Sequence, residues 1–151
     1  MIYPRQTIYS LEALGYMASQ PTGTSIKVRE LAERLDIPRH FLGKVLTELV
    51  KKRFVSSTKG PAGGFVLSVK PTDVTVHTIL SDLEAMDKIE TFCVMGLSEC
   101  DCEHPCVLHM QWKNFKEHAV ERTQDLTLED YSKSLQEKLD NRYKEAMPVA
   151  G

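Results

Sequence analysis

The stretch SIKVRELAERLDIPRHFLGKVLTELVKKRFVSSTKGPAGGFVLSV, residues 25–69, decides the fold. Apolar residues recur at helical spacing as far as Asp36, and Pro38 then closes that helix, because proline disfavours helical geometry in the residue before it. Pro38 can itself occupy the first turn of a second helix, whose apolar residues fall at i, i+3, i+4 and i+7: Leu42, Val45, Leu46 and Leu49. Two helices joined by so short a turn predict a helix-turn-helix.

Two β-prone runs follow, RFVSST at residues 53–58 and GFVLSV at residues 64–69, joined by a glycine-rich tip. They predict a β-hairpin, the wing of a winged helix-turn-helix. A nucleotide-binding loop is the competing interpretation of the glycines, but the stretch lacks the G-x-x-x-x-G-K-[ST] pattern and has strands on both sides. A tip containing Gly60 lets backbone approach a phosphate closely, and Lys59 can enter a minor groove.

The charge of the chain is unevenly distributed. Residues 39–70 hold seven Lys or Arg and one acid, Glu48, so this segment is +6, whereas the remainder of a chain with net charge -2 is -8. A solvated surface that happens to be basic, or a helix-turn-helix used as a protein-interaction module, are the alternatives to a DNA-binding face. The concentration of positive charge on the second helix and the wing favours double-stranded DNA.

The outward face of the second helix carries His40, Gly43, Lys44 and Thr47 at i, i+3, i+4 and i+7. Lys and Arg hydrogen-bond guanine in the major groove, and Thr contacts thymine methyls or phosphates. The basic residues at the far end of the helix are expected to contact phosphates. The predicted DNA-binding residues are Arg39, His40, Lys44, Thr47, Lys51, Lys52, Lys59 and Gly60.

The flanking sequence predicts further helices at residues 7–19 and 75–86, a long helix at 107–123 and a polar helix at 126–147. The long helix has Val107, Met110, Phe115 and Val120 available for burial but little core of its own, which predicts pairing with a second copy in a homodimer. The fold class is therefore mainly α with a small β-hairpin. We expect a winged-helix domain at 1–90, a cysteine-rich loop at 91–109 and dimerisation and C-terminal helices at 107–147.

Composition excludes several classes of protein. The 151 residues suffice for one compact unit with an appendage, and 42% hydrophobic with 26% charged residues is ordinary for a globular protein. No apolar run approaches the roughly 20 residues that span a bilayer, and MIYPRQTIYS does not resemble an export signal. We therefore expect a cytoplasmic protein.

All four cysteines lie in CVMGLSECDCEHPCVLH, residues 93–109. A reducing compartment argues against structural disulfides and for metal or redox chemistry. The donors Cys93, Cys100, Cys102, Cys106 and His109 lack the second C-x2-4-C pair of a typical structural zinc site, although zinc stays open.

The acidic surroundings of these thiols bear on their role, because the same segment holds Glu99, Asp101 and Glu103 and no Lys or Arg. Thiolates in such a segment repel one another unless a cation holds them, and soft thiolate ligands suit an iron–sulfur cluster. A disordered loop with reactive thiols and an enzyme-like redox protein are the alternatives. The acidic loop argues against the low-pKa thiol that the redox protein needs.

The winged helix, the wing SSTKGPAGGFVLS and the cysteine loop before a long helix together resemble the bacterial family of IscR/NsrR-type iron–sulfur transcription regulators. The resemblance runs from about Ile8 to Thr127, and its cysteine pattern falls on Cys93, Cys100 and Cys106, with the histidine of some members at His109. It implies a homodimer with a 2Fe-2S or 4Fe-4S cluster that controls binding to a near-palindromic operator, usually as a repressor sensing redox, iron or nitric oxide status. The resemblance implies no enzymatic activity.

The chain departs from that pattern in ways that leave the fourth ligand open. The first cysteine gap is one residue longer, and Cys102 is additional. His109, Cys102 or an acid from the first helix of the partner subunit are the candidates; the family position of that acid falls on Ile8, with Glu12 one turn later. Gly43 replaces a glutamate that tunes operator choice, so the operator sequence is not carried over.

Overall fold

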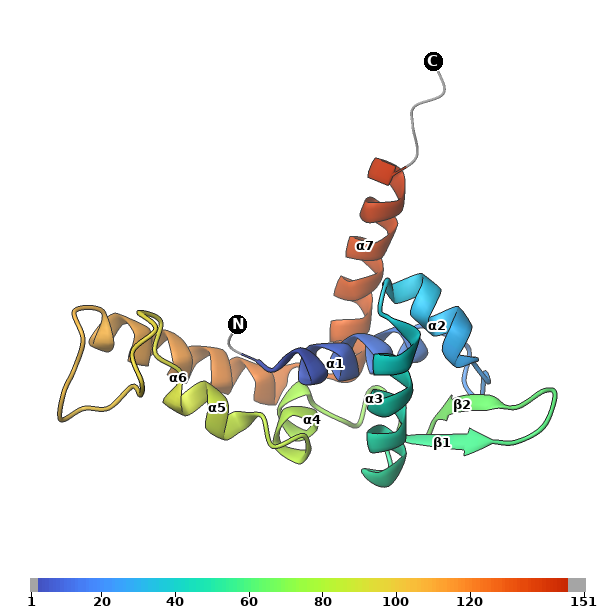
Figure 1. The fold of residues 1–151 in the computed structure, drawn as a ribbon, viewed down its shortest axis with the longest axis horizontal. Coiled ribbons are helices and arrows are strands. Elements are labelled where there is room, and N and C mark those ends of the chain that lie inside the picture. The colour runs from blue at the N-terminus through green and yellow to red at the C-terminus, as the bar shows by residue number, and fades with distance from the viewer. Residues whose placement is uncertain (1–2, 147–151) are drawn as a thin grey trace, which may run out of the picture.

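The computed structural model describes residues 3–146 (Figure 1). It is mainly α-helical with one two-stranded sheet, as the sequence predicts. The elements, in chain order, are α1 (Arg5–Ala18), α2 (Val28–Leu35), α3 (Arg39–Lys51), β1 (Val55–Thr58), β2 (Gly64–Leu67), α4 (Val76–Asp82), α5 (Met86–Thr91), α6 (His109–Asp125) and α7 (Leu128–Ala146).

The helix-turn-helix is formed by α2 and α3. Helix α2 ends at Leu35, its C-cap Asp36 has a left-handed φ of 55°, and the N–H of Ile37 donates back to the carbonyl of Ala32. Helix α3 starts after Pro38, whose extended backbone supplies a carbonyl that accepts the N–H of Leu42. The apolar side of α3 is 0–2% exposed at each of its four predicted core positions. The apolar residues at the predicted helical spacing therefore pack α3 against α1 and α2.

The wing is the antiparallel pair β1–β2, with Val55 opposite Leu67 and Thr58 opposite Gly64. Phe65 exchanges two backbone hydrogen bonds with Ile26, at 2.9 and 2.8 Å, and so ties β2 to the chain before α2. A Cβ at Gly64 would lie 2.7 Å from the Ile26 carbonyl oxygen, so this glycine is required by the close approach of β2 to that segment. The base of the wing is fixed on the helix-turn-helix.

Helix α7 packs across α1 and completes the same core, although its sequence predicts a polar helix. Its Leu128, Leu135 and Leu139 are 0–7% exposed. The crossing is close because Gly15 has no side chain: a Cβ there would lie 2.7 Å from the Tyr131 ring. Ser132 Oγ donates to the Gly15 carbonyl at 2.7 Å.

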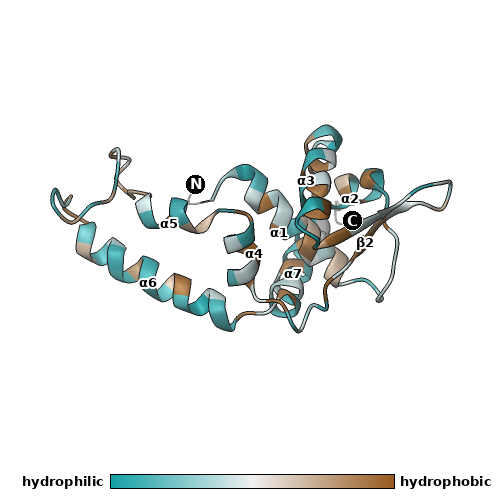
Figure 2. Cartoon of the chain, turned by 90° about the horizontal axis from the view of Figure 1, so that it is seen from below, coloured by the Kyte–Doolittle hydropathy of each residue, from teal (hydrophilic) through white to brown (hydrophobic). Residues whose placement is uncertain are grey.

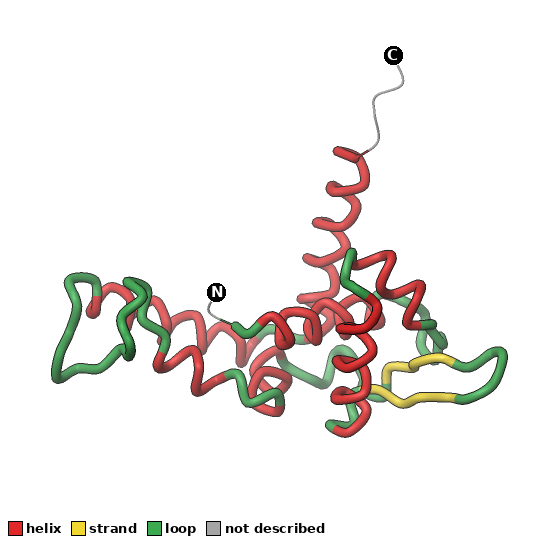
Figure 3. Tube along the Cα trace, viewed as in Figure 1, coloured by secondary structure: helices red, strands yellow, loops and turns green. Residues whose placement is uncertain are grey.

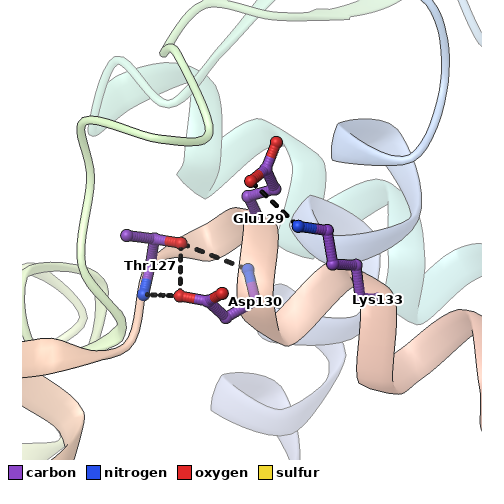
Figure 4. A network of polar contacts seen from close by, with 4 residues as sticks. All are labelled: Thr127, Glu129, Asp130 and Lys133. Atoms are coloured by element: carbon purple, nitrogen blue, oxygen red, sulfur yellow. Dashed lines mark hydrogen bonds and ion pairs between the residues drawn. The ribbon is translucent and has the colours of Figure 1, made fainter.

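A capping box fixes the start of α7 (Figure 4). Thr127 Oγ1 accepts the N–H of Asp130 at 3.2 Å, and Asp130 Oδ2 accepts the N–H and the hydroxyl of Thr127 at 3.0 and 2.7 Å. Two donors that the first turn leaves without helical partners are thus satisfied reciprocally. In the same first turns of the helix, Lys133 Nζ forms an ion pair with Glu129 Oε2 at 3.1 Å.

Helices α5 and α6, with the loop between them, form an arm that extends away from the wing (Figures 1 and 3). The helix predicted at 75–86 is shorter than expected: α4 ends at Asp82, because Glu84 has a left-handed φ of 55°, and α5 then begins. Helix α6 packs on α4, where Thr123 Oγ1 lies 3.4 Å from His77 Nδ1. Within residues 3–146, no helix has the length and apolar character needed to cross a membrane.

Candidate metal centre and nucleic-acid interface

One face of α3 is turned to solvent while the opposite face is buried. Arg39, His40, Lys44 and Thr47 are all exposed, and Gly43 between them is half-buried. Thr47 Oγ1 donates to the Gly43 carbonyl at 2.9 Å, so its methyl group and hydroxyl are held in one orientation on this face. The geometry is that of a helix presenting its N-terminal half to a groove.

Phe41 is a candidate contact residue that the predicted set omits. It is 47% exposed, although every other apolar side chain at the front of α3 is buried, and its ring lies 4.1 Å from that of His40. An exposed phenylalanine can contact a thymine methyl in the major groove. The signal in the sequence is that Phe41 falls outside the i, i+3, i+4 series of core positions.

The remaining predicted DNA contacts divide into two groups. Lys59 and Gly60 are exposed at the wing tip, where Gly60 has a φ of +100° that favours glycine. Lys51 is exposed at the end of α3. Lys52 is half-buried, and its Nζ lies 3.9 Å from Glu84 Oε1, so it faces the α4–α5 turn.

The predicted metal ligands lie at the end of the arm, in residues 92–108 and the first residue of α6 (Figure 3). Cys93 is 5% exposed. The N–H of Leu97, ahead of the N–H groups of Met95 and Gly96 and the thiol of Cys106, lowers the pKa of Cys93 against the opposing effect of burial. Cys93 and Cys106 are therefore neighbours, and the loop is wound so that its amides favour a thiolate.

His109 brings two more thiols together. Its ring is 5% exposed; Cys100 Sγ lies 3.5 Å from Nδ1, and Cys102 Sγ lies 3.5 Å from Nε2. The backbone holds this arrangement, since the N–H of His109 donates to the Cys106 carbonyl and the N–H of Cys100 donates to the Thr91 carbonyl. His104 is exposed, and its N–H donates to Asp101.

The thiols face two sides of the loop. Cys100, Cys102 and His109 line a cleft of about 410 Å³ between α5 and α6, and Cys93 lines a second cleft of about 470 Å³ beside the start of α1. Within residues 3–146, no three Cys, His, Asp or Glu side chains are arranged as a ready metal site. The structure brings the predicted ligands together as a pair and a triad and leaves the two apart.

Glu12 lies elsewhere. It is half-buried on α1, where burial raises the pKa of its carboxyl and Arg142 opposes that rise. Burial, and to a lesser degree the charge of Glu12, raise the pKa of Tyr131 to about 12. Within its own chain Glu12 therefore faces α7 and not the cysteine loop.

The donor chemistry of the loop fits an iron–sulfur cluster. Four thiols and two imidazoles lie within residues 93–109, with three acids and no Lys or Arg among them to neutralise thiolates. These are the ligand types that such clusters take. The four thiols lie on loop backbone, and His109 is the first residue of α6.

Family and structural comparisons assign the chain to a family of transcriptional regulators. The pattern of Rrf2, a family described as an iron-dependent transcriptional regulator, matches residues 3–134. The chain belongs to the Rrf2 family. The IscR-type resemblance of the sequence is thereby confirmed, and the protein is an Rrf2-type regulator of transcription.

Rrf2 relatives cover most of the chain. A predicted HTH-type transcriptional regulator of Aquifex aeolicus is 34% identical over 86% of this chain and 90% of its own. IscR of Vibrio atlanticus is 22% identical over 83% of this chain and 71% of its own. Among solved structures, CymR, the global cysteine regulator of B. subtilis, has a TM-score of 0.65 at 21% identity, covering 87% of this chain and 95% of CymR. IscR of T. potens has a TM-score of 0.60 at 20% identity, covering 97% and 92%.

Proposed function

We propose that this Rrf2 protein is a homodimeric repressor whose operator binding is controlled by an iron–sulfur cluster held in the loop of residues 92–108. The observation that carries the proposal is the gathering of Cys93 with Cys106, and of Cys100 and Cys102 around His109, at the end of one arm of a winged helix. Cys93, Cys100, Cys106 and His109 are the proposed ligands. Either a 2Fe-2S or a 4Fe-4S cluster is compatible with this set.

The DNA-binding part of the proposal is supported by α3 and the wing. Lys44 and Thr47 stand in the middle of the exposed face, and Lys59 stands at the wing tip. The side chains of α3 can therefore read base edges while the wing contacts a flanking groove or phosphates.

The homodimer is supported by the surface of the arm. Val107, Met110 and Phe115 are 86%, 61% and 55% exposed, and of the residues of α6 His109 alone is buried. Large apolar groups on a helix with so little core of its own are covered when a second copy packs on them. A symmetric pair also matches the two half-sites of a palindromic operator.

Control by the cluster follows from the place of the loop. An iron–sulfur cluster supplies redox chemistry and reactivity toward oxygen and nitric oxide. The loop around Cys93 lines a cleft with Tyr3 and Arg5, which lead into α1, and α1 packs on α3. A change in loop order thus reaches the recognition helix through one packed element, so cluster state and operator affinity are linked.

The test is anaerobic purification with measurement of iron, acid-labile sulfide and binding to a duplex selected from a random pool. Brown protein that bleaches with oxygen or nitric oxide is expected, and Cys93→Ala, Cys100→Ala and Cys106→Ala should each abolish the colour. Ser98→Ala, at an exposed position of the same loop, is the matched control and should stay brown. A wild-type protein that binds DNA identically with and without its cluster would refute the regulatory role.

A regulator with zinc, or with thiols alone, is the second candidate. One observation favours it: Cys93 lines a different cleft from Cys100, Cys102 and His109, so the proposed ligands are not assembled at one point. Solved neighbours include an oxidised form of CymR from Staphylococcus aureus, at 17% identity. Colourless anaerobic protein with one tightly held zinc per chain, or operator binding that changes on thiol oxidation in the absence of iron, identifies this candidate.

A further inference from the structure

We infer that Cys102 is a positioning residue for His109: its sulfur accepts the N–H of Nε2 and so directs Nδ1, beside Cys100, toward the metal. The inference rests on the proposed function and assigns the one thiol that the three-cysteine pattern leaves over. It separates His109 and Cys100, which would touch the metal, from Cys102, which would not.

The argument starts from the two nitrogens of one ring. Cys100 Sγ lies 3.5 Å from Nδ1 and Cys102 Sγ lies 3.5 Å from Nε2, so the ring of His109 stands between two thiols. An imidazole ligand gives one nitrogen to the metal, and its other nitrogen donates its N–H to an acceptor that fixes the ring. One thiol therefore lies beside the nitrogen that would bind the metal, and the other lies beside the nitrogen that donates its N–H.

The distance at either nitrogen is that of two ligands on one metal. A tetrahedral ion with a thiolate at about 2.3 Å and an imidazole nitrogen at about 2.1 Å sets the two donor atoms about 3.6 Å apart. The same 3.5 Å also suits an N–H donating to sulfur. Distance thus admits both assignments, and burial and backbone anchoring decide between them.

Cys100 is itself one of the proposed ligands, and it is the more buried of the two thiols beside His109. Its N–H donates to the carbonyl of Thr91, two residues before the buried Cys93, and its side chain is half-buried. Cys102 is exposed, although the ring beside it is only 5% exposed. The nitrogen beside Cys100 therefore lies next to a half-buried proposed ligand, while the nitrogen beside Cys102 lies next to an exposed thiol.

Such an outer partner fixes the tautomer and the orientation of the ring. With the proton on Nε2, the lone pair of Nδ1 is free for the metal, and the ring cannot turn without losing its contact with Cys102. Loss of the acceptor that hydrogen-bonds a ligand histidine typically lowers the metal affinity by roughly 10- to 100-fold, while the set of ligands stays the same.

The first experiment needs no metal. In reduced, metal-free protein with 15N-labelled histidine, the imidazole proton of His109 should be found on Nε2 and protected from exchange with water. Cys102→Ala should lose that protection, and Cys102→Ser, whose hydroxyl can accept the same proton, should retain it. A proton found on Nδ1 in the wild type would overturn the assignment.

The second experiment uses anaerobically reconstituted protein. Cys102→Ala should keep the iron and sulfide content and the Mössbauer signature of the wild type, with a shifted midpoint potential and loss of cluster in air roughly tenfold faster or more. Cys102→Ser should restore much of the difference, whereas Cys100→Ser should change the signature itself.

Each failure has its own meaning. A Mössbauer signature that changes in Cys102→Ala as it does in Cys100→Ser makes Cys102 a ligand and overturns the inference. Cluster retention and potential equal to those of the wild type also overturn it, because Cys102 would then be idle. A wild type that assembles no cluster refutes the proposed function instead, and the metal-free measurement still decides whether Cys102 holds His109.

Discussion

The winged-helix body and the arm differ in how far they bury their apolar side chains. In the body, α1, α3 and α7 share one core whose leucines are 0–7% exposed, and a serine and a glycine bring two of its helices into close contact. In the arm, α6 is largely hydrophilic along its length (Figure 2) and leaves Met110 and Phe115 exposed. The body buries its apolar side chains within one chain, whereas the arm leaves large apolar side chains exposed.

Under the proposed function, the body binds DNA and the arm senses the signal, so the two tasks lie in structures of different stability. A DNA-reading face requires a rigid support, which the body supplies. A sensing loop requires two states of similar free energy, and low local stability permits them. Four substitutions test whether this division holds.

The largest effect is expected from Leu14→Ala in the body. Leu14 is 0% exposed on α1, so truncation leaves a cavity and should lower the free energy of unfolding by about 3 kcal/mol. Urea unfolding measures it, and the loss should not depend on protein concentration. Met110→Ala, at a position 61% exposed, is the arm control; a loss there that matches Leu14→Ala at every concentration would remove the distinction between body and arm.

Phe115→Asp should act on association instead of folding. Phe115 is 55% exposed and stacks on Trp112 at 5.3 Å between ring centroids, so a charge there enters the surface that a second copy covers. We expect the dimer dissociation constant to rise about 100-fold, as for loss of an interface hot spot. Sedimentation reports it, with Asn114→Asp as a control of equal charge. A monomeric wild type at micromolar concentration would contradict the assignment of α6.

Lys44→Ala should affect DNA reading and leave the arm unchanged. Loss of one base contact costs about 2 kcal/mol and should relax preference at one or two base pairs. Lys51→Ala is the comparison, since a phosphate contact should weaken all sequences alike and flatten the salt dependence by about one unit of slope. If Lys44→Ala lowered the affinity for all duplexes equally, Lys44 would contact phosphates and not base edges.

The smallest effect concerns the capping box of α7. Hydrogen bonds from the Thr127 hydroxyl, and then from its N–H, lower the pKa of Asp130. A lowered folded-state pKa gives stability that is present above the ordinary aspartate pKa of about 3.9 and is lost as pH falls through the folded value. Asp130→Asn should therefore flatten the decline of stability below about pH 4. Asp140→Asn on the same helix carries the same charge change without removing the capping hydrogen bonds, and is the comparison variant.

The parts of the fold that were predictable are those set by local pattern. The period of α3, the turn at Pro38 and the two β-prone runs of the wing each determine their own geometry. The sequence does not predict the break between α4 and α5, because Glu84 adopts a left-handed backbone in a stretch that has no glycine or proline. The role of α7 was missed because its apolar face is narrow; Leu128, Leu135 and Leu139 recur at i, i+7 and i+11 among charged residues.

The candidate site was predictable in its membership and not in its arrangement. Residue type and acidity mark the loop as a thiol-rich donor segment, since these are properties of composition. Which thiol lies against which nitrogen depends on how a loop without a regular period turns back on itself. The pairing of Cys93 with Cys106, and of His109 with Cys100 and Cys102, is tertiary information. Phe41 was overlooked because a phenylalanine in a helix is ordinarily assigned to the core.

Trp112 has an optical consequence. It is the chain's one tryptophan, and its Nε1 donates to the Phe92 carbonyl at 2.8 Å, next to Cys93. Tryptophan fluorescence of this chain therefore comes from a single position beside the cysteine loop. A strongly absorbing group in that loop quenches the emission, and its departure restores it. Burial of the neighbouring Phe115 under a second chain moves the emission toward the blue, so intensity and colour report loading and association separately, without a label.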